Sequence, residues 1–190
     1  PSPVAAAILD GDAVTGVTVM KLDETMDTGP IVAQRPAPIG TYETTEELTS
    51  RLFQMGAALL IEELPRWALG ELQAVPQDNS LATVSSRLSR QDGEIDWGRS
   101  AELISRQVRA HFPWPGSFTH LEGVRLKVIE ALEGDADSDL SASPGEVVLL
   151  DRGGLGVGTG SGVLQIRRLQ LEGGTVTASA QFVQGHREFV

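Results

Sequence analysis

Residues 14–30 read VTGVTVMKLDETMDTGP, and this stretch decides the fold of the first half of the chain. Its first seven residues alternate and are rich in β-branched side chains, which predicts a strand. Residues 31–34 form a second apolar run and predict another strand. The polar loop between the two runs holds three acidic residues within a span of five. Because α/β proteins place their chemistry at strand ends, this loop is the first candidate site, with an exposed acidic turn as the alternative.

C-terminal to the second strand, the apolar spacing becomes helical. Thr44 and Glu47 form the pattern of a capping box at a helix start. One face of this helix then carries Leu48, Leu52, Met55 and Leu59. We expect Pro65 to kink or end the helix and Gly70 to stop its last turn. The order strand, loop, strand, helix predicts the end of an α/β layer whose parallel neighbours precede residue 1.

The second half of the chain follows a polar segment, residues 70–93, that has no apolar period and is typical of a linker. Ser100 is expected to cap a helix over residues 101–110, which the Pro-Trp-Pro-Gly turn must end. Short strands between glycine-rich turns are then expected at residues 126–132, 146–150, 155–159, 163–171 and 175–178. This spacing predicts a small all-β barrel or sandwich, with a bulge near Arg167 and Arg168 where the apolar phase shifts.

The composition is that of a folded globular protein. The 190 residues are 41% apolar and 22% charged, enough for one large domain or two small ones. We find no signal peptide, and no apolar run approaches the roughly 18 residues of a membrane span. The absence of cysteine fits a reducing cytosol, so we expect a cytoplasmic protein. Because the chain starts with proline, we expect it to be cut from a longer one.

The net charge of −11 argues against bulk electrostatic attachment to nucleic acid. The acid is uneven, however, with 14 acidic and 6 basic residues in residues 1–94 against 12 and 9 in residues 95–190. We expect no metal site, because the three histidines are scattered along the chain. The acidic run Asp135, Asp137 and Asp139 mimics a calcium loop, but Leu140 occupies the position of its glycine, so we expect a solvated loop.

Several blocks of sequence together resemble the methionyl-tRNA formyltransferase family. The first block is Gly11-Asp12, Thr15-Gly16-Val17-Thr18-Val19-Met20, Leu22-Asp23-Glu24 and Met26-Asp27-Thr28-Gly29-Pro30, a pattern shared by folate-dependent formyltransferases in general. The later blocks are Pro76-Gln77-Asp78 with Ala82-Thr83, Ile95-Asp96-Trp97 with Ser100-Ala101, and Arg109-Ala110 with Pro113-Trp114-Pro115-Gly116-Ser117-Phe118. One position departs from the family, because Phe112 stands where an Asn is usual.

The resemblance implies a fold of α/β plus all-β class. Residues 1–72 would be the C-terminal part of a Rossmann-like formyltransferase domain, residues 73–94 a linker, and residues 95–190 an OB-like β-barrel that binds tRNA. The implied reaction moves a formyl group from 10-formyltetrahydrofolate to the amino group of methionyl-initiator tRNA in translation initiation. The partners would be this tRNA and the folate co-substrate, with no membrane and no metal, and the intact protein would be a monomer.

The resemblance also implies roles for particular residues. Asp27 matches the family's catalytic Asp, and the preceding residues Asp23, Glu24, Thr25 and Met26 match the loop that meets the folate. The family's catalytic Asn and His belong to an Asn-x-His motif that residues 1–190 do not contain, so we expect no turnover from this piece alone. Candidates for tRNA contact are Arg87, Arg90, Arg106, Arg109, Arg125, Lys127, Arg167 and Arg168, each of which taken singly is also explained as solvated surface charge.

Two other functions stay open. The chain could keep the formyltransfer chemistry and use another acceptor, either a sugar amine or water. Alternatively, it could be a stand-alone RNA-binding module whose first half is a dimerisation layer. Salt-dependent binding of initiator tRNA without folate binding would favour the module.

Overall fold

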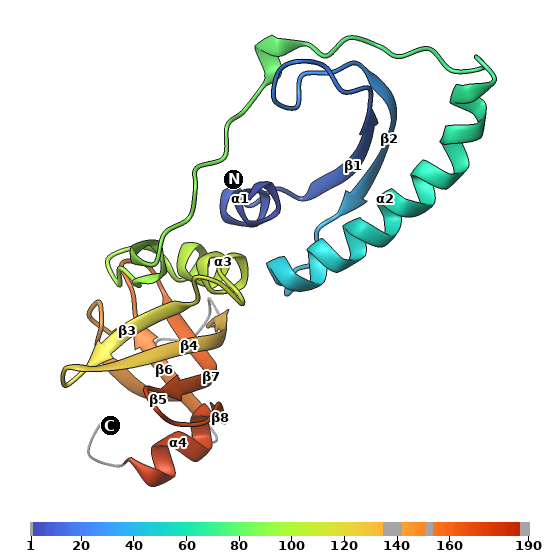
Figure 1. Cartoon of the computed structure of the whole chain (residues 1–190). Coiled ribbons are helices and arrows are strands. Elements are labelled where there is room, and N and C mark those ends of the chain that lie inside the picture. Colours follow the sequence, from blue (N-terminus) through green and yellow to red (C-terminus); the bar gives the residue numbers. More distant parts are fainter. Residues whose placement is uncertain (1, 135–141, 151–153, 187–190) are drawn as a thin grey trace. The chain divides into compact units, whose positions relative to one another are not determined.

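The computed structural model describes residues 2–134, 142–150 and 154–186, and the chain forms two compact units, Pro1–Ser86 and Arg87–Val190 (Figure 1). Each unit is described here by itself. The acidic run from Asp135 to Asp139 lies outside the described residues. Within the described residues, no helix is long and apolar enough to cross a membrane.

The first unit is built on a two-stranded antiparallel sheet. Its elements in chain order are α1 (Pro3–Asp10), β1 (Val14–Met20), β2 (Ile31–Pro38), α2 (Thr45–Ala68) and the short 3-10 helix η1 (Asn79–Leu81). The two predicted strands pair from Val14 opposite Pro38 to Met20 opposite Ile31. Helix α1 was not predicted, and Gly11 in a left-handed conformation ends it.

The capping box of α2 is present as predicted. The Thr44 side chain accepts a hydrogen bond from the Glu47 N–H, and the Glu47 carboxylate accepts one from the Thr44 N–H. Of the predicted apolar face, Leu48, Leu52 and Leu59 are buried. The helix does not end at Pro65 but continues to Ala68, and Gly70 follows with a φ of 75°. Past Pro65 the helix is exposed except for the half-buried Trp67, and the left-handed Gly70 marks its end, as expected.

The second unit combines one helix over a sheet with a short helix at its end. Its elements are η2 (Gln91–Gly93), α3 (Ala101–Ala110), β3 (Ser117–Leu121), β4 (Val124–Glu133), β5 (Val147–Leu150), β6 (Gly154–Gly158), β7 (Val163–Leu171), β8 (Thr177–Ala178) and α4 (Ser179–Gly185). Helix α3 has the predicted bounds, and the Ser100 hydroxyl accepts a hydrogen bond from the Leu103 N–H. The predicted strands correspond to β4–β8, whereas β3 and α4 were not predicted.

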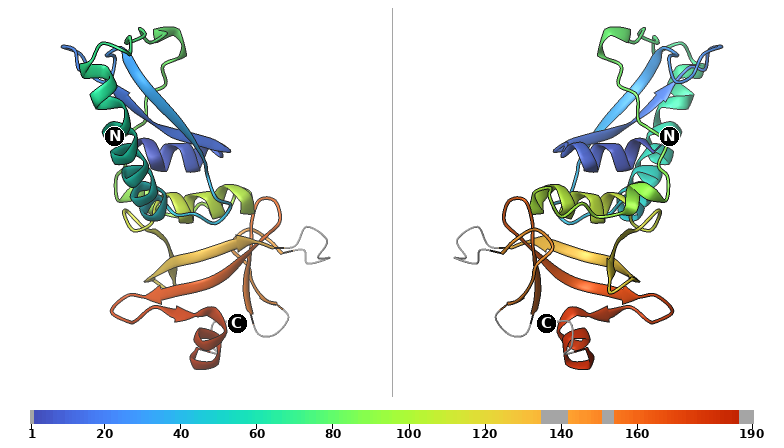
Figure 2. Two further views of the ribbon diagram at one scale, coloured as in Figure 1. Left: turned by 90° about the vertical axis from the view of Figure 1, so that its right-hand side faces the viewer. Right: turned by 90° about the vertical axis from the view of Figure 1, so that its left-hand side faces the viewer.

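The sheet of this unit is antiparallel, in the order β3-β4-β7-β6-β5, with β8 paired to β7 (Figure 2). Strands β3 and β5 are the ends of this path, and within the described ranges no pairing joins them, so no closed barrel is found there. The predicted bulge is confirmed. The β4–β7 register shifts around Glu130, and Arg167 is not paired with a residue of β4 in this register. One core fills the unit, with Ile104 of α3 packed against residues of β4, β7 and α4.

Candidate functional site

The loop of residues 21–30 joins β1 to β2 and is closed at its base. The backbone N–H of Lys21 donates to the carbonyl of Pro30 over 2.9 Å. Gly29 lies so close to the opposite strand of this neck that a Cβ there would be 1.8 Å from the Lys21 carbonyl oxygen. Only glycine therefore fits at position 29 without a change of the neck, which explains the glycine of the Asp-Thr-Gly pattern in physical terms.

The carboxylate of Asp23 organises the inside of this loop. It accepts hydrogen bonds from the Thr25 N–H at 3.0 Å and from the Thr28 hydroxyl at 2.9 and 3.0 Å, and the two threonine hydroxyls also contact each other. The backbone hydrogen bond from Thr25, followed by that from the Thr28 hydroxyl, lowers the pKa of Asp23 below its usual value. Asp23 thus holds the loop in shape through its ionised side chain.

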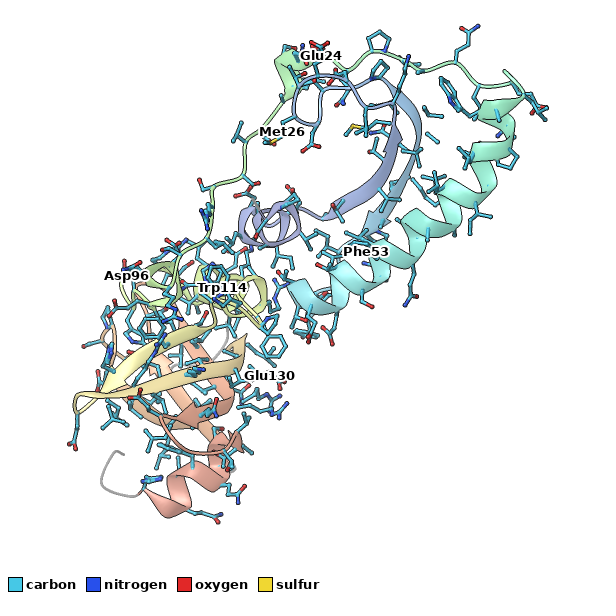
Figure 3. All side chains as sticks on the ribbon, viewed as in Figure 1. Glu24, Met26, Phe53, Asp96, Trp114 and Glu130 are labelled. Carbon is cyan, nitrogen blue, oxygen red and sulfur yellow. The ribbon has the colours of Figure 1, made fainter. Side chains whose placement is uncertain are left out.

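Asp27 lies at the turn of the loop in an uncommon backbone conformation. Its φ is 58°, in the left-handed region that Asp tolerates better than most residues. The side-chain Nε2 of Gln77 donates to the Asp27 carbonyl and to the Gly29 carbonyl, each over 2.8 Å. The Asp27 side chain is exposed, as is Met26, whose exposed fraction is 80% (Figure 3). The loop therefore presents a carboxylate and an apolar side chain to solvent from a fixed backbone.

Gln77 reaches the loop because the segment before it pairs with the start of β2. The N–H and carbonyl groups of Val75 and Ile31 exchange two hydrogen bonds of 2.8 Å. One residue past Gln77, the Asp78 carboxylate accepts hydrogen bonds from the N–H and hydroxyl of Ser80 and starts η1. Sequence reasoning placed this segment in a linker and missed Gln77 as a site residue. The sequence signal that could have revealed Gln77 was the Pro-Gln-Asp block, because a segment that only connects two domains does not require these particular residues.

An apolar groove of about 660 Å³ lies between β1, α1 and α2. It is lined by Val4 of α1, by residues 16–20 of β1 and by α2 side chains that include Phe53. Phe53 has an exposed fraction of 78%, which is unusual for an aromatic residue on the apolar side of a helix (Figure 3). This groove belongs to the same unit as the loop and reaches Met20, the last residue before it.

Three of the eight predicted tRNA contacts share one face of the sheet in the second unit. The strand register places Arg125 opposite His120, Lys127 opposite Gln170, and Arg168 opposite Glu130. Residues that are paired across antiparallel strands point to the same side, so the basic residues form a strip across β4 and β7. The guanidinium of Arg125 stacks over the Phe118 ring at 3.6 Å, which fixes one end of this strip.

The other predicted contacts lie in separate places. Arg106 and Arg109 follow each other on the last turns of α3, where burial, and next the charge of Arg106, lower the pKa of Arg109. Arg106 also forms an ion pair with Glu102. The remaining three are exposed: Arg87 and Arg90 precede η2, and Arg167 is at the bulge of β7. The eight residues therefore come from the segment before η2, from α3, and from strands β4 and β7.

The turn after α3 closes without a contribution from the side chain at position 112. The Gly116 N–H donates to the His111 carbonyl over 2.9 Å, and His111 itself is buried, which lowers its pKa. Trp114 at the tip has an exposed fraction of 53% (Figure 3). Among the described residues, no group of three or more His, Asp or Glu side chains is arranged to hold a metal ion.

Comparison with known proteins decides the family. A model described as formyl transferase matches residues 1–64, and a model of the formyl transferase C-terminal domain matches residues 87–187. The chain belongs to the formyl transferase family. The second family model covers the unit with the basic strip, and the first covers the Asp27 loop.

The curated relatives of this formyl transferase chain are longer than the chain itself. It is 46% identical over 171 residues to the methionyl-tRNA formyltransferase of Chloroflexus aggregans, covering 90% of this chain and 55% of that one. It is also 46% identical over 189 residues to the Roseiflexus castenholzii methionyl-tRNA formyltransferase, covering 98% and 59%. The chain thus spans little more than half the length of these relatives.

A solved structure shows the same fold in a more distant protein. HypX from Aquifex aeolicus, in complex with tetrahydrofolic acid, matches with a TM-score of 0.70 at 21% identity, covering 96% of this chain and 32% of HypX. At this identity the likeness supports the formyl transferase fold.

Proposed function

We propose that the chain is part of an enzyme that transfers a formyl group from 10-formyltetrahydrofolate to the amino group of methionyl-initiator tRNA. The observation that carries this proposal is the 21–30 loop, whose neck, interior and turn are each fixed by hydrogen bonds around an exposed Asp27. The identity of 46% to proteins named methionyl-tRNA formyltransferase supports the choice of acceptor.

The reaction requires proton transfer from the acceptor amine and to N10 of the folate. A bond forms between the amine nitrogen and the formyl carbon, and the bond from that carbon to N10 of the folate breaks. One proton leaves the amine, and one proton arrives at N10. A carboxylate on a backbone that hydrogen bonds hold in place, as that of Asp27 is, can orient the groups that carry this proton and stabilise the positive charge on them. We therefore assign Asp27 as a catalytic residue.

We propose that residues 23–26 form one edge of the folate site. Glu24 and Met26 are exposed on the loop, so a flat heteroaromatic ring can lie against the Met26 side chain and the loop backbone. Asp23 and Thr25 contribute less directly, because their side chains bond to each other and keep the loop in shape.

For tRNA we propose the basic strip of Arg125, Lys127 and Arg168 as the main contact. The OB-like domain that carries it keeps the range 95–190 as a prediction. Phosphate groups are the natural ligands of such a strip. Arg106 and Arg109 on α3 are a second contact. Contacts of tRNA with Arg87, Arg90 and Arg167 stay predictions. The same holds for the catalytic part over residues 1–72 and the linker over residues 73–94. A monomeric intact protein and a cytoplasmic location also stay predictions.

A hybrid enzyme tests the acceptor. In it, this chain replaces the matching segment of the Chloroflexus aggregans methionyl-tRNA formyltransferase. We expect this hybrid to formylate methionyl-initiator tRNA, and to use a nucleotide-linked amino sugar or water at least about 100-fold less well, since a wrong acceptor leaves buried polar groups unpaired. Preferred formylation of the amino sugar, or release of formate without tRNA, would replace this proposal by the first alternative. Salt-dependent tRNA binding by the 190-residue chain, with an inactive but folded hybrid, would favour the binding module.

A further inference from the structure

We propose that Gln77 is a positioning residue for Asp27, which fixes the turn of the 21–30 loop through its side-chain amide. This inference deepens the proposed function and rests on it for the catalytic role of Asp27. The geometry itself is independent of that function. The Nε2 atom of Gln77 lies 2.8 Å from two carbonyl oxygens, those of Asp27 and Gly29, and uses both of its hydrogens on the loop.

The two carbonyls belong to the part of the loop that the other anchors do not hold. The Asp23 carboxylate accepts from the N–H of Thr25 and the hydroxyl of Thr28, and the neck is closed by the N–H of Lys21 and the carbonyl of Pro30, so neither anchor engages the carbonyl of Asp27 or Gly29. In the described part of the chain, Gln77 is the donor seen for the carbonyls of Asp27 and Gly29. A single amide group thus holds two peptide planes of the loop, Asp27–Thr28 and Gly29–Pro30.

The backbone of Asp27 needs such a restraint. A φ of 58° is a sparsely populated conformation for a residue other than glycine, and it persists when the surroundings over-determine it. Without Gln77, the peptide after Asp27 would be free to rotate, and the carboxylate would move with it. Displacements of about 1 Å at a reacting group cost up to about 100-fold in rate.

The position of Gln77 is itself set by the backbone. Val75, two residues earlier, is paired on both sides with Ile31, the first residue of β2, and Asp78 caps η1 immediately afterwards. The backbone is therefore held at Val75 and at Asp78, on either side of Gln77. Gln77 has little freedom to move between these two points. In this interpretation the Pro-Gln-Asp block holds the catalytic loop in place through the Gln77 side chain.

The isosteric change Gln77→Glu separates the hydrogen bonds from the packing. A carboxylate has the same size but only accepts, so two carbonyl oxygens would face a negative oxygen. The same repulsion raises the pKa of the introduced Glu, and once protonated it donates one hydrogen bond again. Gln73→Glu is the matched control, because it makes the same chemical change at an exposed position of the same segment.

Two measurements test the inference. In the ¹⁵N-labelled 190-residue chain at pH 7.5, we expect NMR order parameters of residues 23–29 to fall in Gln77→Glu and to stay unchanged in Gln73→Glu. In the hybrid enzyme, we expect Gln77→Glu to lower kcat about 10–100-fold and to change KM for methionyl-tRNA by less than about twofold. The loss should shrink as the pH falls and the new Glu is protonated, whereas Gln77→Ala should show no such recovery.

Unchanged order parameters in Gln77→Glu would overturn the inference. So would a loop that loses order while kcat stays within about twofold of the parent hybrid, because the order that Gln77 gives the loop would then not serve to position Asp27 for the reaction. If the parent hybrid does not formylate methionyl-tRNA at all, the proposed function fails. In that case the order parameters alone decide whether Gln77 holds the loop.

Discussion

Asp23 and Asp27 are four residues apart in one loop, yet their surroundings give them different tasks. The carboxylate of Asp23 is turned inward to Thr25 and Thr28, while Asp27 is bonded through its backbone and keeps its carboxylate exposed. The resemblance assigned Asp27 to catalysis and Asp23 to the folate loop, but it did not indicate that the Asp23 side chain bonds within the loop. The distinction depends on backbone conformation and on Gln77, 50 residues away, which no local pattern encodes.

The hydrogen bonds to Asp23 make the loop sensitive to acid. The pKa of Asp23 is lower in the folded chain than its ordinary value of 3.8. At pH values above 3.8 the ionised carboxylate therefore stabilises the loop, and this stabilisation is lost as the pH falls through the folded-state pKa. A ¹³C NMR titration of the Asp23 carboxyl should give a midpoint below 3.8, and the order parameters of residues 23–29 should fall over the same pH range. A midpoint at or above 3.8 would show that the Thr25 and Thr28 bonds are absent in solution.

The neck of the loop should not tolerate a side chain at Gly29. The change Gly29→Ala places a methyl group 1.8 Å from the Lys21 carbonyl oxygen, so the neck must open. We expect a loss of about 1–3 kcal/mol in the free energy of unfolding and faster trypsin cleavage after Lys21.

Gly185→Ala is the control for this change, since its new methyl group meets no atom within 4 Å. Equal stability and equal cleavage rates for the two variants would contradict the closed neck.

At the scale of elements, the sequence predicted best where local chemistry and burial agree. The capping residues Thr44 and Ser100 marked the starts of α2 and α3, and the apolar phase shift marked the bulge near Arg167. Strand β3 was missed because SFTHL is short and polar and depends on pairing with β4. Gly70 was expected to stop the last turn of α2, and the helix does end just before it, whereas an end at Pro65 did not occur.

The basic strip on β4 and β7 gives a prediction for tRNA binding. We expect Lys127→Ala and Arg168→Ala each to weaken binding of initiator tRNA to the 190-residue chain. Each should also reduce the slope of log K against log salt by about 0.7–0.9, the loss of one phosphate contact. Filter binding at four salt concentrations measures both quantities.

Arg35→Ala is the control for these variants, because Arg35 belongs to the first unit and pairs with Glu62 at 2.7 Å. An equal loss of slope in all three variants would show that binding is not concentrated on the strip.

At the scale of the whole molecule, the sequence predicted two compact parts and their classes of secondary structure. The structure divides the chain at Ser86, and the matched family models leave residues 65–86 between them. The OB-like barrel that the resemblance implied is not confirmed, since no closed barrel is found among the described residues; pairing at the edges of a sheet depends on contacts remote in sequence. The polar segment after Gly70 was predicted to be a linker. In the structure, Val75 pairs with Ile31 and Gln77 donates to the Gly29 carbonyl, so both residues contact other parts of the first unit.

The central claim is that the 21–30 loop is the catalytic loop of a formyltransferase, with Asp27 as its acting carboxylate. The most direct measurement is kcat for formyl transfer from 10-formyltetrahydrofolate to methionyl-initiator tRNA in the hybrid enzyme and in its Asp27→Asn variant. Asp10→Asn, at the exposed end of α1, serves as the control. We expect Asp27→Asn to lower kcat about 100- to 10,000-fold with an unchanged Tm, and Asp10→Asn to leave it unchanged. An Asp27→Asn hybrid that keeps kcat within a few fold of the parent would contradict the claim.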